Sequence, residues 1–299
     1  MNPLPDTAMA MQAAREASVC AAKFRLPLRR MVWRGGAGEM AGAGSGSSLD
    51  FQDHRGYLPG DDPRHINWAA YARTGNYSMK LFREEVSPTV EILFDASRSM
   101  FLNEAKARLA CGLLAFAVDA AQRDSATLII HLLDGPRHRL LRAEEIASGR
   151  WTSHLATSPD PQAYPPVPPH LDAVALRSAS LRVWITDLLF PGSPAPILRA
   201  LLRQRGSGIL LAPYAHEEAD PGWDGVCDFH DVEAGLVEAR DVDESLRRRY
   251  LTAYRSHFAV WKEEATRHHL ALAQVPAGQG LAQALATAAL ASHALEPAS

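Results

Sequence analysis

From residue 90 onward, short apolar runs alternate with segments in which apolar residues recur at helical spacing. The apolar runs, which predict buried strands, are residues 90–95, 126–133, 181–187, 208–213 and 270–275. The helical spacing predicts helices over residues 104–123, 143–148, 195–205, 243–268 and 281–290. Because strands and helices alternate, we expect an α/β fold with a doubly wound, mostly parallel sheet.

A tight turn follows the second apolar run. Asp134 and Gly135 form a dipeptide typical of hairpin turns, and residues 137–141 predict a strand that returns antiparallel to that run. We therefore expect one antiparallel strand at the edge of the sheet. If the strand order is 3-2-1-4-5-6, with the hairpin strand counted third, the run ending at residue 95 lies beside the run ending at residue 187.

The first 88 residues differ from this pattern. Residues 8–24 predict a short helix, and residues 35–48 are almost all Gly, Ala and Ser, which is typical of a loop. We expect residues 1–50 to form a small N-terminal appendage of this helix and the Gly-rich loop. Residues 51–88 are expected to form a motif segment packed on the main domain, which we place at residues 89–295.

Composition narrows the possible functions. The net charge is −3 with acidic and basic residues interspersed, so no broad basic face is expected for nucleic acid or for an anionic membrane. Cys20, Cys111 and Cys227 are widely spaced and form no Cys-x-x-Cys pair, so neither a disulfide framework nor a zinc site is predicted. No window approaches the roughly 20 apolar residues that a membrane helix needs. We expect a cytoplasmic protein.

Two of the predicted strands end in a carboxylate. Asp95 ends the first run and Asp187 ends the fourth, and the expected order brings the carboxyl ends of these strands together. Ser97 and Ser99 add hydroxyl oxygens from the loop that follows Asp95. Carboxylate and hydroxyl oxygens suit hard cations, so these four residues predict a site for Mg²⁺ or Mn²⁺, or for Ca²⁺.

A structural reading of the same residues stays open. Asp95 and Ser97 can accept hydrogen bonds from backbone amides at the start of the following helix, and Asp187 can pair with a nearby Arg. Under this reading the Asp-x-Ser-x-Ser pattern only caps a helix.

The second group of candidate residues lies in a segment rich in turn-forming residues. Pro63 fixes one backbone dihedral angle there, the Asp side chains can accept backbone hydrogen bonds, and the Arg side chains can pair with those acids or with carboxylates of a partner. A structural role and a partner-binding role both remain open. The candidates are Arg55, Tyr57, Gly60, Asp61, Asp62, Arg64, Trp68 and Arg73.

These motifs carry a family resemblance. The run from Arg55 to Trp68, the Ala-Arg-Thr-Gly sequence at residues 72–75 and the Asp-Ala-Ser-Arg-Ser-Met sequence at residues 95–100 together closely resemble bacterial "domain of unknown function 58" proteins. The resemblance is dense over residues 51–100. It is looser beyond, where Asp-Val-Glu-Ala-Gly at residues 231–235 and the helix around Tyr250 are also similar to the family.

The resemblance implies a von Willebrand A-like fold and a metal-ion-dependent adhesion site (MIDAS). Asp95, Ser97 and Ser99 match the first part of that site, and Asp187 matches its last acidic position. Its middle Thr normally lies in a loop that here spans residues 151–169, where no Gly-Thr pair occurs. Thr152 and Thr157 are the candidates for that position.

The resemblance also implies a partner, because members of the family are often encoded beside MoxR-type AAA+ ATPases and are thought to act with them in maturing or remodelling proteins. We expect a non-enzymatic adaptor that binds a divalent cation, a MoxR-type ATPase and a target protein. The alternatives are a scaffold with a degenerate metal site and a metal-dependent hydrolase. The chain has no Gly-x-Ser-x-Gly or His-Glu-x-x-His motif, which argues against the hydrolase.

Overall fold

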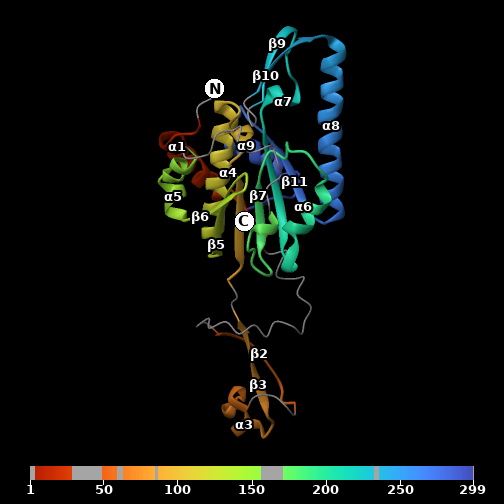
Figure 1. Cartoon of the computed structure of the whole chain (residues 1–299). Helices are drawn as coiled ribbons and strands as arrows, with labels where there is room; N and C mark the ends of the chain where they lie inside the picture. Colours follow the sequence, from red (N-terminus) through yellow and green to blue (C-terminus); the bar gives the residue numbers. More distant parts are fainter. Residues whose placement is uncertain are drawn as a thin grey trace. The chain divides into compact units, whose positions relative to one another are not determined.

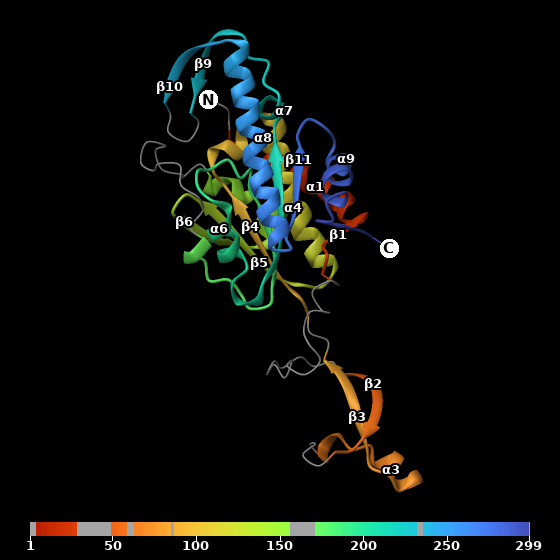
Figure 2. The same ribbon diagram turned by 90° about the vertical axis from the view of Figure 1, so that its right-hand side faces the viewer.

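The computed structural model describes residues 4–28, 49–58, 63–84, 87–155, 171–231 and 236–298. The chain divides into two compact units, drawn in Figures 1 and 2. The main unit comprises Met1–Arg34 and Pro88–Ser299, and the hairpin unit comprises Gly35–Ser87. No helix within the described ranges is both long enough and apolar enough to span a membrane.

A six-stranded sheet forms the centre of the main unit. In order across the sheet its strands are β11 (Ala271–Pro276), β8 (Ser207–Tyr214), β7 (Leu181–Ile185), β4 (Thr89–Asp95), β5 (Thr127–Asp134) and β6 (Arg137–Leu141). All neighbours pair in parallel except β6, which returns antiparallel along β5 at the edge. In chain order this is 3-2-1-4-5-6, so the predicted fold class and strand order are confirmed.

The register of β4 with β7 decides what lies at the end of the sheet. Val90 faces Leu181 and Phe94 faces Ile185, so the two strands end side by side. Every residue of β4 from Val90 to Asp95 is buried. Buried parallel strands of this kind need helices on both faces.

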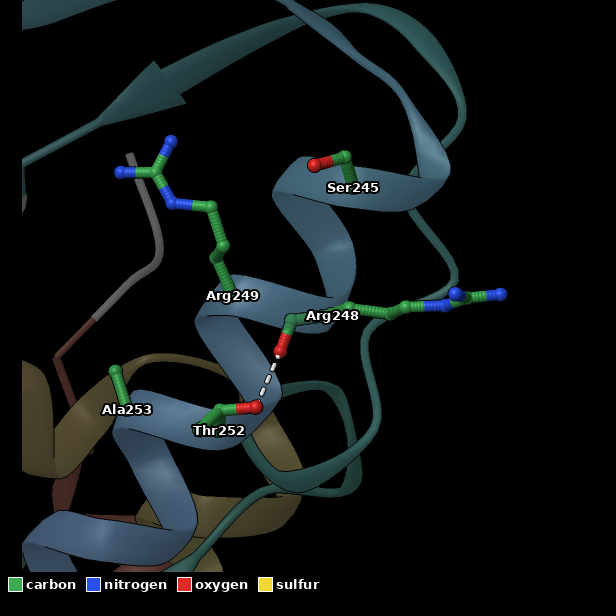
Figure 3. A pocket seen from close by; sticks show the side chains of 5 residues that line it. All are labelled: Ser245, Arg248, Arg249, Thr252 and Ala253. Carbon is green, nitrogen blue, oxygen red and sulfur yellow. Dashed lines mark hydrogen bonds between the residues drawn. The ribbon is translucent and has the colours of Figure 1, made fainter.

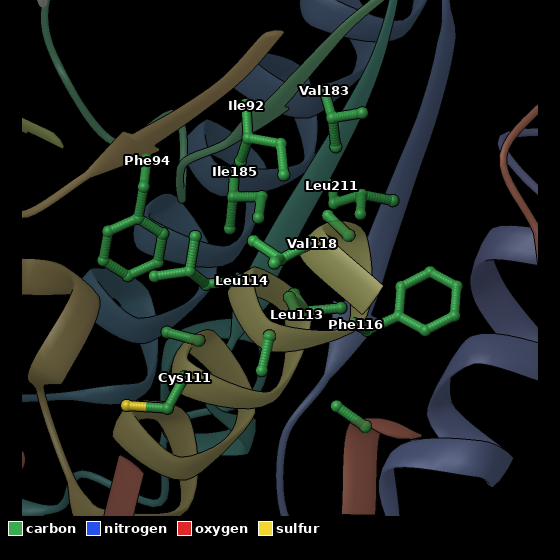
Figure 4. Packing of buried hydrophobic residues seen from close by; sticks show 14 of the residues in the cluster. Ile92, Phe94, Cys111, Leu113, Leu114, Phe116, Val118, Val183, Ile185 and Leu211 are labelled. Carbon is green, nitrogen blue, oxygen red and sulfur yellow. The ribbon is translucent and has the colours of Figure 1, made fainter. Parts of the chain in front are cut away.

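Two hydrophobic cores cover the two faces of the sheet. Ile92, Ile185 and Leu114 belong to the first core, and Figure 4 shows this packing of β4 and β7 against α4. The helices on this face are α1 (Thr7–Ala21), α4 (Glu104–Arg123), α5 (Ala143–Ala147) and α9 (Leu281–Ala284), which continues as a π-helical segment over Leu285–Leu290. On the opposite face, α6 (Pro194–Leu201) and α8 (Glu244–Arg267) cover Leu93 and Trp184.

The N-terminal helix is part of the main unit. We expect an appendage here, but α1 packs along α4 through Ala10, Ala13 and Ala17, which are all buried. Small side chains at this helical spacing let the two helices approach closely. The helix ends at Ala21, and Phe24–Arg25 (β1) then pairs antiparallel with Glu296–Pro297 (β12) near the C-terminus. The Gly-rich residues 35–48 lie outside the described ranges.

Short elements complete the main unit. A second antiparallel hairpin, separate from the sheet, is formed by β9 (Gly225–His230) and β10 (Val237–Val242). Helix α7 (His216–Ala219) follows β8, and 3₁₀ turns lie at Arg98–Phe101, Arg150–His154, Leu171–Ala173 and Arg203–Arg205. The predicted helix over residues 195–205 ends earlier, at Leu201, and Gln204 has a left-handed backbone that cannot continue it.

The hairpin unit is built from two antiparallel strands and a short helix. Its elements are β2 (Leu49–Gly56), a 3₁₀ turn at Pro63–His65, α3 (Trp68–Thr74) and β3 (Ser78–Glu84). Asn67 caps α3 by accepting a hydrogen bond from the Ala70 amide, and Gly75 ends it in a left-handed conformation. No residue of α3 is buried.

A buried ionic cluster joins the three central strands, near the amino ends of β4 and β7. The guanidinium of Arg182 in β7 lies 3.5 Å from the carboxylate of Glu91 in β4, and His131 in β5 lies 3.5 Å from the same carboxylate. Ser180 and the Arg177 amide donate further hydrogen bonds to Glu91. Arg182 itself is fully buried and donates to the carbonyls of Leu201 and Arg177. These contacts satisfy the buried carboxylate of Glu91 and the buried guanidinium of Arg182.

The position of the Arg182 guanidinium predicts that Gly206 does not tolerate a side chain. A Cβ at Gly206 would collide with that guanidinium, so Gly206→Ala should destabilise the main unit by about 1–3 kcal/mol through overpacking. Gly222→Ala is the matched control, because a Cβ there meets no atom within 4 Å. Urea unfolding followed by the fluorescence of the buried Trp residues measures both variants. Equal midpoints for the two variants would contradict the prediction.

Candidate functional site at the carboxyl end of the sheet

Asp95, at the end of β4, is the centre of the candidate site. Its side chain is only 4% exposed. One carboxylate oxygen accepts a hydrogen bond from the Ser97 amide at 2.9 Å, and the other accepts one from the Thr186 hydroxyl at 2.7 Å. Among the described residues it forms no ion pair.

Ser97 and Ser99 lie in the loop that follows. Their hydroxyl oxygens are 3.2 Å apart, and both side chains are half-buried. Ser97 also hydrogen-bonds the Asp95 carboxylate closely enough to favour its charged form. The loop thus brings two hydroxyl oxygens beside one buried carboxylate, as the Asp-x-Ser-x-Ser spacing predicts.

Asp187 lies two residues beyond the end of β7. It is 2% exposed, and its Oδ1 accepts a hydrogen bond from the Leu189 amide at 3.1 Å. Its Oδ2 accepts one from the ammonium of Lys106 in α4 at 3.0 Å. The structural reading of the sequence expected an Arg in this place, so the partner of Asp187 is a lysine that sequence reasoning missed.

Lys106 holds a second carboxylate as well. Its Nζ lies 2.6 Å from Oε1 of Glu218 in α7, and Oε2 of Glu218 accepts a hydrogen bond from the Ala215 amide. Although burial alone lowers the pKa of a lysine, the charges of Asp187 and Glu218 outweigh it and raise the pKa of Lys106. Burial raises the pKa of Glu218 in spite of the nearby ammonium.

The electrostatics of Asp95 reflect its burial and its neighbour. Removal from water, together with the negative charge of Asp187, raises the pKa of Asp95 to about 7. Two buried carboxylates therefore lie within range of each other, and Lys106 pairs with only one of them. The binding of a proton or a cation by this pair of carboxylates is favourable, because it removes uncompensated buried charge.

The loop after β7 is strained beside the site. Leu188 is fully buried and has a left-handed backbone with φ of 61°. Its amide donates to the Thr186 hydroxyl at 3.3 Å, and its carbonyl lies 2.8 Å from Nε2 of His257 in α8. A non-glycine residue in this conformation costs on the order of 1–3 kcal/mol and persists only where the surroundings hold it. The loop is thus held by β4 on one side and by α8 on the other.

Of the two candidates for the middle Thr of the adhesion site, the structure describes only Thr152. Thr152 lies elsewhere, because its hydroxyl donates to the Gly149 carbonyl and lies 3.4 Å from the Thr7 hydroxyl of α1. Thr157 lies outside the described residues. The threonine that does contact Asp95 is Thr186. The register of the two strands points to this threonine, since the last pair is Phe94 and Ile185, and Asp95 and Thr186 are the residues that follow them.

The donor set fits a hard divalent cation. It consists of two carboxylates and two or three hydroxyl groups at the ends of β4 and β7, with no nitrogen or sulfur ligand. Each carboxylate oxygen already accepts one hydrogen bond, but each has a second lone pair. Asp95, Ser97, Ser99 and Asp187 are therefore the residues that could hold the ion.

Two candidate residues of the hairpin unit, Tyr57 and Trp68, belong to an aromatic cluster that sequence reasoning did not assemble. Tyr71 and Tyr77 stack with ring centres 4.4 Å apart, Trp68 meets both edge-on, and Tyr57 lies 6.1 Å from Tyr77. Trp68 is 58% exposed. We call Tyr57, Trp68, Tyr71 and Tyr77 the aromatic cluster.

The charged candidates of the same segment that the structure describes lie on three different elements, β2, the 3₁₀ turn and α3. Arg64 and Arg73 are exposed, and Arg73 donates to the Ala69 carbonyl of its own helix. Arg55 lies in β2 opposite Met79. Gly60, Asp61 and Asp62 lie outside the described residues, so the predicted turn chemistry stays a prediction.

A surface pocket on α8 is separate from these residues. It has a volume of about 530 Å³ and is lined by Ser245, Arg248, Arg249, Thr252 and Ala253. In Figure 3 the side chains of Arg248 and Arg249 point in different directions from the helix. No carboxylate lines this pocket, so it does not suit a divalent cation.

Comparison with known proteins gives a family match. The family model described as "Protein of unknown function DUF58" matches residues 53–260, which is more than half of the chain. The match includes Asp95, Ser97, Ser99 and Asp187. No curated protein matches the sequence.

Two solved structures from Bacteroides are similar to the chain. An aerotolerance-related membrane protein from Bacteroides fragilis NCTC 9343, carrying multiple mutations to serines, has 13% identity and a TM-score of 0.31, with 60% of this chain and 100% of that chain covered. The conserved hypothetical protein BatB from Bacteroides thetaiotaomicron has 13% identity and a TM-score of 0.32, with 61% and 99% covered.

The raised pKa of Asp95 predicts a pH-dependent stability. Because folding raises this pKa from 3.8 to about 7, the folded chain keeps a proton that the unfolded chain releases in between. The stabilisation is fully present below pH 3.8 and is lost as the pH rises through about 7. In EDTA, the free energy of unfolding should fall by about 2–3 kcal/mol between about pH 5 and about pH 8.

Asp95→Asn is the control, because an amide does not ionise and keeps the shape of the carboxyl group. Urea unfolding across this pH range should show a shallower dependence for the variant than for the wild type. Parallel profiles would mean that the pKa of Asp95 is not raised.

Proposed function

The chain belongs to the family of proteins of unknown function DUF58, and we propose that it is a non-enzymatic protein-interaction module with a von Willebrand A-like fold that binds a divalent cation. Asp95, Ser97, Ser99 and Asp187 hold the ion. The observation that carries the proposal is the pair of buried carboxylates, Asp95 and Asp187, of which Asp95 forms no ion pair within the described ranges. Mg²⁺ or Mn²⁺ suits this set of oxygen ligands, and Ca²⁺ is a third candidate.

The chemistry of the donor set suggests how a partner binds. A bound hard cation keeps a coordination position for a ligand from outside the chain, such as a carboxylate of a partner protein. Ion and partner then bind cooperatively, because each supplies part of the other's binding site. The residues of this chain orient the ion: Thr186 and the Ser97 amide fix Asp95, while Leu189 and Lys106 fix Asp187.

The aromatic cluster of the hairpin unit is proposed as a second contact surface. Trp and Tyr are enriched among the interface residues that contribute most to the binding free energy, since they combine a large apolar area with a polar end. Trp68 and Tyr77 are each about half exposed, which leaves this area open to a partner. Arg64 and Arg73 add positive charge on the same unit.

The family resemblance suggests the identity of the partner. We propose a MoxR-type AAA+ ATPase, for which this chain acts in the cytoplasm as an adaptor that recognises a target protein during maturation or remodelling. Neither nucleic acid nor a membrane is part of this proposal, in keeping with the interspersed charges of the chain.

A scaffold without bound metal is the second candidate function. It is favoured by one observation: each oxygen of Asp95 and Asp187 already accepts a hydrogen bond from the protein. In that case Asp95 and Lys106 only hold the loops in place. A hydrolase is the weakest candidate, since Ser97 and Ser99 hydrogen-bond each other and the chain has no Gly-x-Ser-x-Gly or His-Glu-x-x-His motif.

Metal binding is the first prediction of the proposal. Calorimetric titration of Mg²⁺ and Mn²⁺ into the wild type should show one site, and Asp95→Asn should lower the affinity at least about 100-fold by removing a charged ligand. Asp228→Asn is the matched control, because it removes an exposed carboxylate of the β9–β10 hairpin. If the wild type binds neither ion, the scaffold function replaces the proposed one.

The second prediction concerns the aromatic cluster. In titrations with a purified MoxR-type ATPase at saturating Mg²⁺, Trp68→Ala should weaken binding about tenfold or more, as loss of a central interface aromatic does. Val19→Ala is the control, because Val19 is equally exposed, at 59%, on α1. Equal effects of both substitutions would remove the aromatic cluster from the interface.

A further inference from the structure

We infer that Lys106 sets the cation affinity of the Asp95–Asp187 site by acting as a fixed positive charge inside it. The inference rests on the proposed metal-binding function and adds a residue that the resemblance to the family does not assign. It starts from the position of Lys106. The lysine is one of the largest fully buried side chains of the chain, and its ammonium lies between Asp187 and Glu218. Lysine is almost never fully buried unless it is paired.

The charges around Lys106 do not balance. Asp95, Asp187 and Glu218 are all at most 8% exposed and carry three negative charges when ionised, whereas Lys106 carries one positive charge. The cluster is then left with a net charge of −2, in a region where uncompensated charge is expensive. One divalent cation neutralises it.

Lys106 also competes for Asp187 directly. Its Nζ lies 3.0 Å from Oδ2, and the Leu189 amide already donates to Oδ1. A metal ion at the site therefore shares Asp187 with the ammonium and is repelled by its charge. Both effects lower the affinity for the ion, and both disappear when the positive charge is removed.

Glu218 offers a way to separate charge from structure. It faces Lys106 from α7, and its backbone carbonyl accepts a hydrogen bond from Tyr250 of α8 at 2.8 Å. That backbone contact is kept when only the side chain changes. Glu218→Gln removes one negative charge without touching the residues proposed to hold the ion, and the one amide oxygen of Gln can still accept from either the Ala215 amide or Lys106.

Four forms of the full chain therefore vary the net charge of the cluster, and they are compared at a pH above about 7, where Asp95 is ionised. With every carboxylate ionised, Glu218→Gln has a charge of −1, the wild type has −2, Lys106→Met has −3, and the double variant Lys106→Met/Glu218→Gln returns to −2. Met fills the volume of the lysine stem without its charge. The affinity for Mg²⁺ and Mn²⁺ is measured for each form by calorimetry, and folding is checked by near-UV circular dichroism and thermal unfolding.

The affinity should follow the charge. We expect Glu218→Gln to bind most weakly, the double variant to bind at least as tightly as the wild type, and Lys106→Met to bind most tightly. Each unit of charge should change the affinity by about tenfold or more. If Lys106→Met alone does not fold, the double variant and Glu218→Gln still test the order.

The outcomes separate this inference from the proposed function. If the wild type binds an ion and the affinities do not follow the charge, Lys106 is only a structural tie and the inference fails alone. If the wild type binds no ion but either Lys106 variant does, Lys106 replaces the metal in the native protein; the inference then stands and the proposed function fails. If none of the four forms binds, both fail.

Discussion

The parallel pairing of β4 with β7 is the constraint on which the rest of the structure depends. It buries both strands between two layers of helices, so their few charged side chains must find partners inside the protein. At the amino ends Glu91 of β4 meets Arg182 of β7. At the carboxyl ends Asp95 meets Thr186 and lies within range of Asp187, where two carboxylates of like charge share one buried region.

The buried charges at the two ends of this strand pair are compensated differently. Arg182 is paired with Glu91 and donates to two carbonyls, and Gly206 leaves room for its guanidinium, so this cluster is well satisfied. At the other end Lys106 pairs with Asp187 and Glu218, while Asp95 has hydrogen bonds but no cation among the described residues. A surplus of buried negative charge beside a strained loop is more typical of a functional site than of a structural one.

The hairpin unit differs from the main unit in how little of its helix and aromatic surface is buried. Its helix α3 buries no residue, and its aromatic rings stack on one another with Trp68 and Tyr77 half exposed. A two-stranded hairpin with a short helix has little apolar area to bury on its own. An exposed aromatic surface on such a unit therefore agrees better with a role in binding than with a role in holding a core.

The sequence by itself determined the fold and the ends of the central strands. Apolar runs and helical spacing depend on local periodicity, so they predicted helix α4 at Glu104–Arg123 and the return strand at Arg137–Leu141, whereas the strand order came from the doubly wound fold that their alternation implied. They also placed Asp95, Ser97, Ser99 and Asp187 at one edge of the sheet. Only the tertiary structure decided which groups surround them, because Lys106, Thr186 and Glu218 come from separate elements whose contacts depend on packing rather than on spacing. It likewise placed Thr152 against α1, away from the site, since the fold of its loop follows no local pattern.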